Sequence, residues 1–302
     1  MNQLLTKTIY DVSGRIALVT GGGTGIGLMI ARALAANGAK VYVSSRRNEV
    51  IESTADEHGP QTGGEIIPLE LDVTDKTSIK NAVQVIQKND GKLDLLFNNA
   101  GRSGPKSPFF TDESAPENKD SHTLGSSMFD AEEFEGKSHW SSLYTTNASS
   151  IFFVTTAFLG LLHKASDERG AWSAGIINTS SISGQMKRSQ NHFAYNSAKA
   201  ASIHLTKMFS TELALKGIPV RVNSIAPGMF PSEMTGHQGQ DMSGEKASAI
   251  GKGITGVPMQ RGGAETDMAG VALFLASPAS YYITGQVVTV DGGYIATNPA
   301  VV

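Results

Sequence analysis

The sequence predicts a single α/β domain built as a doubly wound parallel sheet of about seven strands with helices on both faces. Three observations support this prediction. Short runs rich in Val, Ile and Leu recur along the chain, and helical patterns lie between them. The first run breaks into a glycine-rich turn that opens a helix, and several later runs end in hydroxyl, amide or glycine residues. We expect the domain to span residues 14–294, with tails at 1–13 and 295–302.

The first strand is expected at residues 15–20, followed by a glycine turn and an alanine-rich helix that ends near Asn37. This order of strand, glycine turn and helix is the one that a dinucleotide site requires. Glycines let the backbone approach a pyrophosphate, and the free N–H groups at the helix start bind its charge. The cofactor-binding candidates of this turn are Gly21, Gly23, Thr24, Gly25, Ile26 and Gly27.

The second strand, residues 40–45, ends at Ser45 and is followed by Arg46 and Arg47. An acidic residue at this position would bind both free hydroxyls of an adenosine ribose. Ser45 cannot do so, whereas a hydroxyl and two guanidinium groups suit a 2′-phosphate through charge-assisted hydrogen bonds. The residues therefore favour NADP(H) over NAD(H) as cofactor. The alternative is that the two arginines belong to a solvated turn.

A third strand, residues 66–71, leads to Asp72 and Val73, and a helix follows at 76–88. The fourth strand, 93–97, runs into Asn98, Asn99, Ala100 and Gly101. Strands that alternate with helices through short loops indicate a parallel sheet.

Residues 102–127 interrupt this rhythm, because they are rich in Pro, Ser, Asp, Glu and Gly and show no apolar period. We interpret them as a surface insertion; a role in capping the substrate or in a subunit contact is the alternative. A long helical region is expected at 129–162, with Asn147 inside it. Asparagine is unfavourable in mid-helix, which suggests a special role, although an ordinary polar core residue remains the simpler interpretation.

Residues 176–184 indicate a buried strand that ends in hydroxyls and a glycine. A helix at 195–217 and a sixth strand at 218–225 follow, and the strand runs into Ala226-Pro227-Gly228. Residues 229–260 are rich in Gly and Met, which suits a mobile flap over a substrate; a poorly ordered loop is the alternative. A helix to Ala276 and a last strand at 285–293 complete the domain.

Tyr195 and Lys199 are four residues apart, so that they lie on one face of the expected helix. Moving the pKa of a phenol from near 10 to about 7 takes about 4 kcal/mol. One cation about 5 Å away supplies about 3 kcal/mol at an effective dielectric constant near 20. We therefore expect Lys199 to lower the pKa of Tyr195, which could then exchange a proton at neutral pH. The pattern alone occurs by chance in many helices, so its context must support it.

Composition argues against several classes of function. The chain has 302 residues, a net charge of −3 and no cysteine, and its histidines are scattered. We expect no nucleic-acid partner, no membrane partner and no metal site. The start of the chain lacks a basic segment followed by an apolar run, and no segment approaches the length of a membrane span, so we expect a cytoplasmic protein.

Taken together, these motifs resemble the classical short-chain dehydrogenase/reductase family, a family with a single-domain Rossmann fold. The resemblance covers residues 14–294 and includes the closing Asp291-Gly292-Gly293. The segment 226–235 is similar to the subgroup of rhamnolipid-type 3-oxoacyl-(acyl-carrier-protein) reductases.

The resemblance implies a catalytic set of Asn147, Ser181, Tyr195 and Lys199. In such a set Tyr195 protonates a carbonyl oxygen while a hydride arrives from nicotinamide, and Ser181 donates a hydrogen bond to the same oxygen. Lys199 holds the nicotinamide ribose, and Asn147 positions a water that relays protons to Lys199. Ser180 and Ser183 are alternatives to Ser181.

The resemblance also assigns cofactor contacts. Asp72 is expected to meet the adenine amino group beside Val73, and Asn98 to stabilise the central sheet. Contacts with the nicotinamide half are implied for Asn99, Ala100, Gly101, Tyr195, Lys199, Pro227, Gly228 and Met229.

The reaction expected from this resemblance is NADPH-dependent reduction of a ketone, with a β-ketoacyl or secondary-metabolite carbonyl as candidate substrate. An NAD-dependent alcohol or sugar dehydrogenase and a non-catalytic nucleotide sensor remain alternatives. A largely apolar substrate pocket is expected from Met186, Phe193, Met229, Phe230 and Met234. A carrier-protein substrate is less supported, because the acidic insertion offers no basic landing surface. Relatives suggest a homotetramer, with a dimer second.

Overall fold

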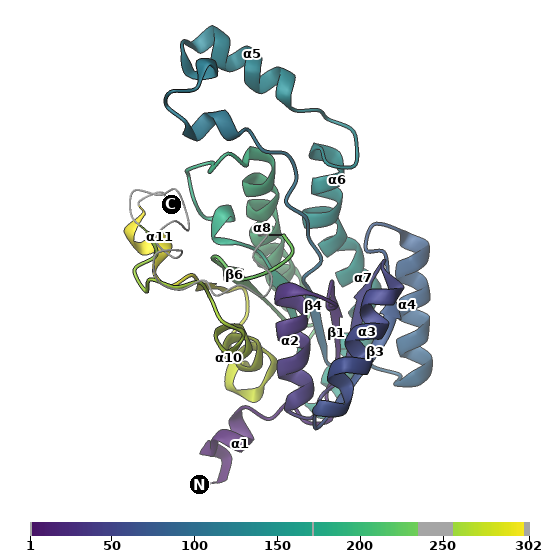
Figure 1. Cartoon of the computed structure of the whole chain (residues 1–302). Helices are drawn as coiled ribbons and strands as arrows, with labels where there is room; N and C mark the ends of the chain where they lie inside the picture. The colour runs from purple at the N-terminus through teal and green to yellow at the C-terminus, as the bar shows by residue number, and fades with distance from the viewer. Residues whose placement is uncertain (1, 171, 235–255, 299–302) are drawn as a thin grey trace.

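The computed structural model describes residues 2–170, 172–234 and 256–298. The described residues form one sheet of seven parallel strands in the order β3-β2-β1-β4-β5-β6-β7, which confirms the predicted fold class (Figure 1). The strands are β1 (Ile16–Thr20), β2 (Lys40–Ser45), β3 (Glu65–Glu70), β4 (Leu95–Asn98), β5 (Ala174–Thr179), β6 (Val220–Pro227) and β7 (Val287–Val290). The order reverses between β1 and β4, which is the topological switch point where such sheets bind ligands.

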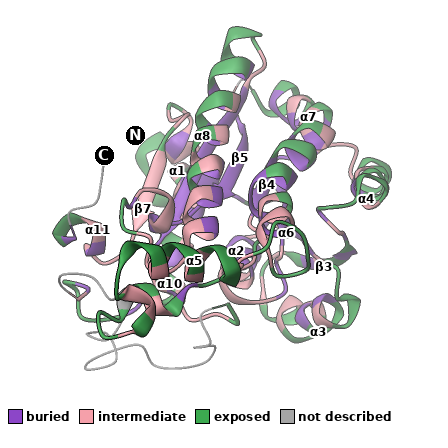
Figure 2. Cartoon of the chain, turned by 90° about the horizontal axis from the view of Figure 1, so that it is seen from above, coloured by how far each residue is buried: buried purple, intermediate pink, exposed green. Residues whose placement is uncertain are grey.

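Helices cover both faces of the sheet and bury one apolar cluster on each (Figure 2). One face carries α2 (Gly25–Ala36), α3 (Asn48–His58) and α10 (Glu265–Ala276). The other carries α4 (Lys76–Asn89), α7 (Ser150–Arg169) and α8 (Phe193–Leu215). The inner strands β1, β2, β4, β5 and β6 are almost completely buried, which explains why they appear as nearly continuous apolar runs, whereas the edge strands β3 and β7 are partly exposed.

The remaining elements are short. They are η1 (Asn2–Leu4), α1 (Thr6–Ile9), η2 (Gly59–Gln61), η3 (Pro108–Thr111), η4 (Pro116–Asn118), α5 (Ser121–Ala131), α6 (Trp140–Tyr144), the π turn η5 (Thr145–Ser149), η6 (Ile182–Gly184), η7 (Pro278–Ser280) and α11 (Tyr294–Thr297).

The region 102–162 differs from the prediction. The insertion is not devoid of structure, because η3, η4 and α5 lie within it, and α5 stands away from the sheet (Figure 1). The Asp120 side chain caps α5 by accepting a hydrogen bond from the Thr123 N–H, and no residue of α5 is buried. A helix held by a cap on the surface needs no apolar period. The expected helix from 129 is likewise broken, since α5 ends at Ala131 and α6 begins at Trp140.

Both predicted tails contain structure that the sequence did not indicate. The N-terminal one includes α1, and Val12 is buried in the core. The C-terminal one begins inside α11, and Asn298 is buried. Most of the flap predicted at 229–260 lies outside the described residues.

One helical stretch, Trp140–Arg169, is long and apolar enough to cross a membrane by length and composition, contrary to our expectation. Half of its most apolar window is buried inside the molecule, and Val154, Phe158 and Leu162 pack in the core cluster with α4. The stretch therefore behaves as a core helix of this domain.

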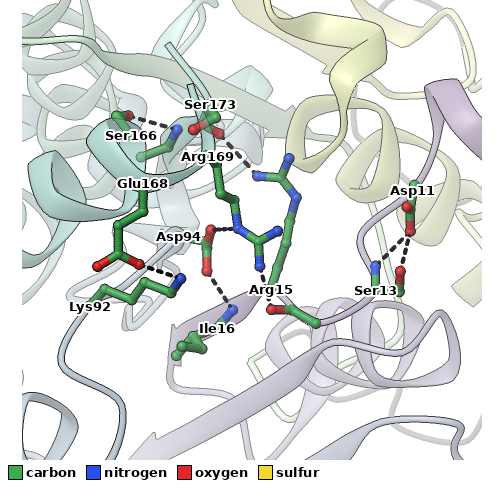
Figure 3. Close-up of polar contacts among 12 residues, drawn as sticks. Asp11, Ser13, Arg15, Ile16, Lys92, Asp94, Ser166, Glu168, Arg169 and Ser173 are labelled. Carbon is green, nitrogen blue, oxygen red and sulfur yellow. Dashed lines mark hydrogen bonds and ion pairs between the residues drawn. The ribbon is translucent and has the colours of Figure 1, made fainter. Parts of the chain in front are cut away.

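A polar network ties the strands together at their amino ends, opposite the edge where ligands bind (Figure 3). The buried Asp94 carboxylate accepts a hydrogen bond from the Ile16 N–H at 2.9 Å and pairs with the Arg169 guanidinium. Arg15 donates to the Ser173 carbonyl at 3.0 Å. These contacts join β1, α7 and the start of β5, and they leave the carboxyl edge free for the site.

Candidate active site

A cavity of about 520 Å³ opens at the carboxyl edge of the sheet, within the usual size range of small-molecule sites. Its walls come from the turns that follow β1 to β6. The residues predicted to bind cofactor that line it are Gly21, Gly23, Thr24, Gly25, Ile26, Gly27, Ser45, Arg46, Arg47, Asp72, Val73, Asn99, Ala100, Gly101, Tyr195, Lys199, Pro227 and Gly228. Met229 is the exception, because it packs against a small apolar cluster that contains Met186 and Ile182.

The glycine turn brings backbone, not side chains, to the cavity wall. Gly21 and Gly25 have φ angles of +63° and +53°, a region that favours glycine. A Cβ on Gly27 would lie 2.2 Å from the Gly21 carbonyl oxygen, so a larger residue does not fit there. Thr24 precedes α2 and makes no side-chain cap hydrogen bond. The first N–H groups of α2 therefore remain available to an anion.

The end of β2 presents a hydroxyl and two arginines. The Ser45 hydroxyl accepts a hydrogen bond from the Arg47 N–H at 3.0 Å. The Arg47 guanidinium forms an ion pair with the Glu233 carboxylate at 2.9 Å, and both side chains are about half exposed, at 51% and 46%. Glu233 was not predicted, because it follows β6 in a segment whose motif does not specify this contact. The free protein thus holds a carboxylate where the sequence suggested only cations.

The predicted Ser, Tyr and Lys come together at the opposite end of the cavity. Lys199 donates a hydrogen bond from Nζ to the Thr179 carbonyl at 2.7 Å, and Nζ lies 5.8 Å from the centre of the Tyr195 ring. Ser181 lines the same end of the cavity, where its hydroxyl lowers the pKa of the Tyr195 phenol. The Ser181 oxygen also accepts a hydrogen bond from the Ser183 N–H at 3.1 Å, which leaves its own proton free to donate.

The two alternative serines occupy different surroundings. The Ser180 hydroxyl donates to the Ile225 carbonyl at 3.0 Å and accepts from the Ser224 hydroxyl at 2.7 Å, so it is engaged with β6. Ser183 contributes its backbone N–H to Ser181. Of the three serines, Ser181 is therefore the one placed to act with Tyr195.

Burial dominates the electrostatics of this pair. It lowers the pKa of Lys199 from 10.5 to about 8. It also raises the pKa of Tyr195 above its ordinary value, although the Ser181 hydrogen bond opposes this rise. The direction is opposite to the one we expected from Lys199, because burial disfavours the charged phenolate. At neutral pH the site thus holds a neutral phenol beside an ammonium group.

Asn147 lies in the π turn η5, a geometry that is common at functional sites. Its side chain accepts a hydrogen bond from the Arg102 N–H and donates one to the Arg102 carbonyl, both at 2.9 Å. The side chain is buried and does not line the cavity, whereas the neighbouring Thr146 does. Asn147 therefore fixes the segment that follows β4, and the water-positioning role stays a prediction.

Buried amides hold the centre of the sheet below the site. Asn98 donates from Nδ2 to the Asn178 side-chain oxygen at 2.9 Å and to the Thr155 hydroxyl at 3.1 Å. Asn99 is anchored by its N–H to the Thr20 hydroxyl at 2.9 Å. Asp72 caps its own turn by accepting the Thr74 N–H at 2.9 Å. These bonds position the turns after β1, β3, β4 and β5.

Other residues also line the large cavity but were not predicted as site residues. They are Val50, Leu71, Thr74, Arg102, Ser103, Thr146, Thr179, Ser232 and Glu233. Phe230 and Met234, predicted for the substrate pocket, also line the cavity, while Phe193 borders a different pocket. Within the described ranges, no group of three or more His, Asp or Glu side chains could hold a metal ion.

Comparison with known proteins adds to this geometry. Residues 15–243 match the family model described as short chain dehydrogenase. The chain is similar to short-chain dehydrogenase/reductase PhomF of Diaporthe leptostromiformis, with 38% identity over 98% of this chain and 97% of that protein. It is similar to the rhamnolipids biosynthesis 3-oxoacyl-[acyl-carrier-protein] reductase of Pseudomonas aeruginosa, with 32% identity over 94% and 98% of the two chains. The solved Pseudomonas aeruginosa RhlG/NADP active-site complex has a TM-score of 0.77 and 31% identity, and covers 95% of this chain and 98% of its own.

Proposed function

This chain belongs to the short-chain dehydrogenase family of oxidoreductases, and we propose that it is an NADPH-dependent reductase that converts a ketone into an alcohol. One observation carries the proposal. Tyr195, Ser181 and Lys199 gather at one end of a single cavity, and the glycine turn and Arg47 line the same cavity. A candidate proton donor and a candidate dinucleotide site thus line the same cavity.

Each proposed catalytic residue has a role in proton transfer to the carbonyl oxygen of the substrate. When bound, the nicotinamide cofactor supplies a hydride. Tyr195 gives its phenolic proton to the carbonyl oxygen, and Ser181 donates a hydrogen bond to the same oxygen as negative charge develops on it. Lys199 is positively charged at pH values below its pKa of about 8, and this charge stabilises the phenolate of Tyr195 that forms when the proton is transferred. Asn147 holds the Arg102 backbone and, in this proposal, orders the water that returns protons to Lys199.

The proposed cofactor is NADP(H), because the β2 end offers what a 2′-phosphate requires. Ser45, Arg46 and Arg47 line the cavity there, and none of them is acidic. The similar RhlG structure is a complex with NADP, which supports this choice. An incoming phosphate would have to displace Glu233 from Arg47, since the ion pair occupies one edge of that guanidinium. NAD-dependent oxidation of an alcohol or sugar is the second candidate.

Two substitutions beside the end of β2 test whether the protein prefers NADPH to NADH. Arg47→Gln is expected to raise the Kd for NADPH about tenfold and to change the Kd for NADH little, because one charged hydrogen bond to phosphate is worth about 1.5 kcal/mol or more. Glu233→Gln is expected to lower the Kd for NADPH about threefold by removing a competing anion. Titration of cofactor fluorescence measures both, with the exposed Glu49→Gln as control. Equal losses of NADPH and NADH affinity in Arg47→Gln would show that this arginine only supports the turn.

The candidate substrates are ketones and β-ketoacyl compounds, and the 32% identity to the rhamnolipid reductase supports the second group. We propose a cytoplasmic protein with small-molecule substrates and neither nucleic acid nor membrane as partner.

We also propose a homotetramer, with a dimer as the second candidate. Exposed apolar side chains on α7 and α8, such as Phe152 at 46% and Met208 at 49%, support such an assembly.

The proposed activity is tested by NADPH and NADH oxidation with a panel of ketones, β-ketoacyl thioesters and quinones. Turnover with NADPH is the expected result. Tight NADPH binding without turnover of any substrate would favour the nucleotide sensor, and faster turnover with NADH would favour the NAD-dependent dehydrogenase.

A further inference from the structure

A second, smaller pocket of about 320 Å³ lies between the insertion and the loop that precedes α8. Its apolar wall is formed by Phe110 and Phe193, whose rings meet edge to face with centres 5.3 Å apart. Lys187 and Arg188 are exposed at its border, and Ser189 and Gln190 complete the lining. The pocket thus combines an aromatic wall with two cations.

The two walls of this pocket continue into the active site. On one wall, Ser103 lines the large cavity and Phe110 the small pocket. On the other wall, Tyr195 lines the large cavity and Phe193 the small pocket. A hydrogen bond from the Ser107 N–H to the Asn191 carbonyl, 3.0 Å long, joins the walls between these points. The large cavity and the small pocket therefore share their two walls, on either side of this contact.

Among the described residues, the cations of this region have no carboxylate in ion-pair distance. In the described part of the chain, Lys106, Lys187 and Arg188 form no ion pair with a carboxylate within 4.0 Å. The nearby Glu132 is occupied, because it accepts hydrogen bonds from the Ser107 hydroxyl and the Trp140 indole N–H. Cations without an ion-pair partner among the described residues, beside an apolar wall, favour an organic anion.

The loop between the two sites is held in an uncommon conformation. Gln190 and Asn191 have φ angles of +51° and +69°, where residues other than glycine are rarely found. The Gln190 side chain donates to the Tyr294 hydroxyl at 3.1 Å, which fixes the loop against α11. Such a fixed loop keeps Lys187 and Arg188 at the pocket border.

We propose that the small pocket binds an anionic group, a carboxylate or a phosphate, on the substrate whose carbonyl lies at Tyr195. This inference rests on the proposed reductase function and adds the substrate class: an apolar ketone with an acidic group at its far end. It also changes the expectation that no basic surface lies beside the acidic insertion, since Lys106 belongs to that insertion and Lys187 and Arg188 border it.

Matched pairs of substrates test the proposal. The first set consists of aryl keto acids of increasing chain length, each paired with its neutral methyl ester, and tests whether the pocket binds a carboxylate. The second is a β-ketoacyl coenzyme A thioester and its N-acetylcysteamine analogue, which tests the phosphate. In Lys187→Met/Arg188→Met the KM of at least one anionic member is expected to rise about tenfold, while kcat and the KM of its neutral partner stay unchanged. Lys216→Met, which removes one charge at the other end of α8, is the control. The single variant Arg188→Lys, in which Lys187 is kept, is expected to retain most of the affinity.

The outcomes separate the two proposals. Equal effects on anionic and neutral partners, or none on either, would overturn the anionic subsite while leaving the reductase function intact. If no ketone is reduced, the reductase function fails, and calorimetric binding of the keto acids to the wild-type protein and the double variant still decides the subsite. Equal dissociation constants for these two proteins would overturn it.

Discussion

Tyr195→Phe is expected to lower kcat/KM for carbonyl reduction about 10³-fold, within the range that general acids contribute. The substitution removes the phenolic oxygen and leaves a ring of the same shape beside Lys199. The affinity for NADPH should change less than about tenfold, because one neutral hydrogen bond to ribose is worth about 1 kcal/mol net. Initial rates of NADPH oxidation and a fluorescence titration measure the two quantities.

Tyr144→Phe provides the matched control, because Tyr144 stacks on Trp140 at 6.1 Å between ring centres and does not line the cavity. Its activity should equal that of the wild type. If Tyr195→Phe kept most of its activity, Tyr195 would not be the proton donor.

Ser181→Ala is expected to lower kcat about 10²- to 10³-fold, as the loss of one hydrogen bond to a developing oxyanion does in comparable sites. Ser181→Thr should retain much of the activity, since it keeps the hydroxyl. The loss should appear in kcat more than in KM, because the hydrogen bond strengthens as charge develops on the oxygen.

Ser180→Ala and Ser183→Ala show whether the assignment to Ser181 is right. Ser180 bonds to Ile225 and Ser224 within the sheet, so its loss should affect the midpoint of thermal unfolding more than kcat. A larger loss of kcat in either control than in Ser181→Ala would transfer the role to that serine.

Much of the fold could be predicted because local patterns determine it. The strand from Lys40 to Ser45 was placed with its observed bounds, since fully buried parallel strands are short apolar runs. A helix after the glycine turn was also expected, but α2 begins at Gly25, inside the predicted turn, and not at Leu28, where the apolar pattern begins. The region 102–162 could not be predicted, because α5 depends on its Asp120 cap and buries no residue, and the π turn at Asn147 depends on Arg102, which is distant in sequence.

The site was predictable where a motif names its residues and not where contacts depend on tertiary structure. Residues such as Gly21, Tyr195 and Lys199 line one cavity as expected. Glu233 was missed because nothing in its segment indicates that it reaches Arg47. The direction of the Tyr195 pKa shift was also missed, since the sequence shows the nearby lysine but not the burial that raises the pKa.

The proposed reductase activity is tested most directly by following the hydride from NADPH to the product alcohol. The protein is incubated with NADPH deuterated at the transferable C4 position and with a ketone that it reduces, and the alcohol is analysed by mass spectrometry. We expect one deuterium on the carbinol carbon of the alcohol formed by the wild type, and almost no alcohol with Tyr195→Phe. Unlabelled alcohol, or equal amounts of labelled alcohol from both proteins, would contradict it.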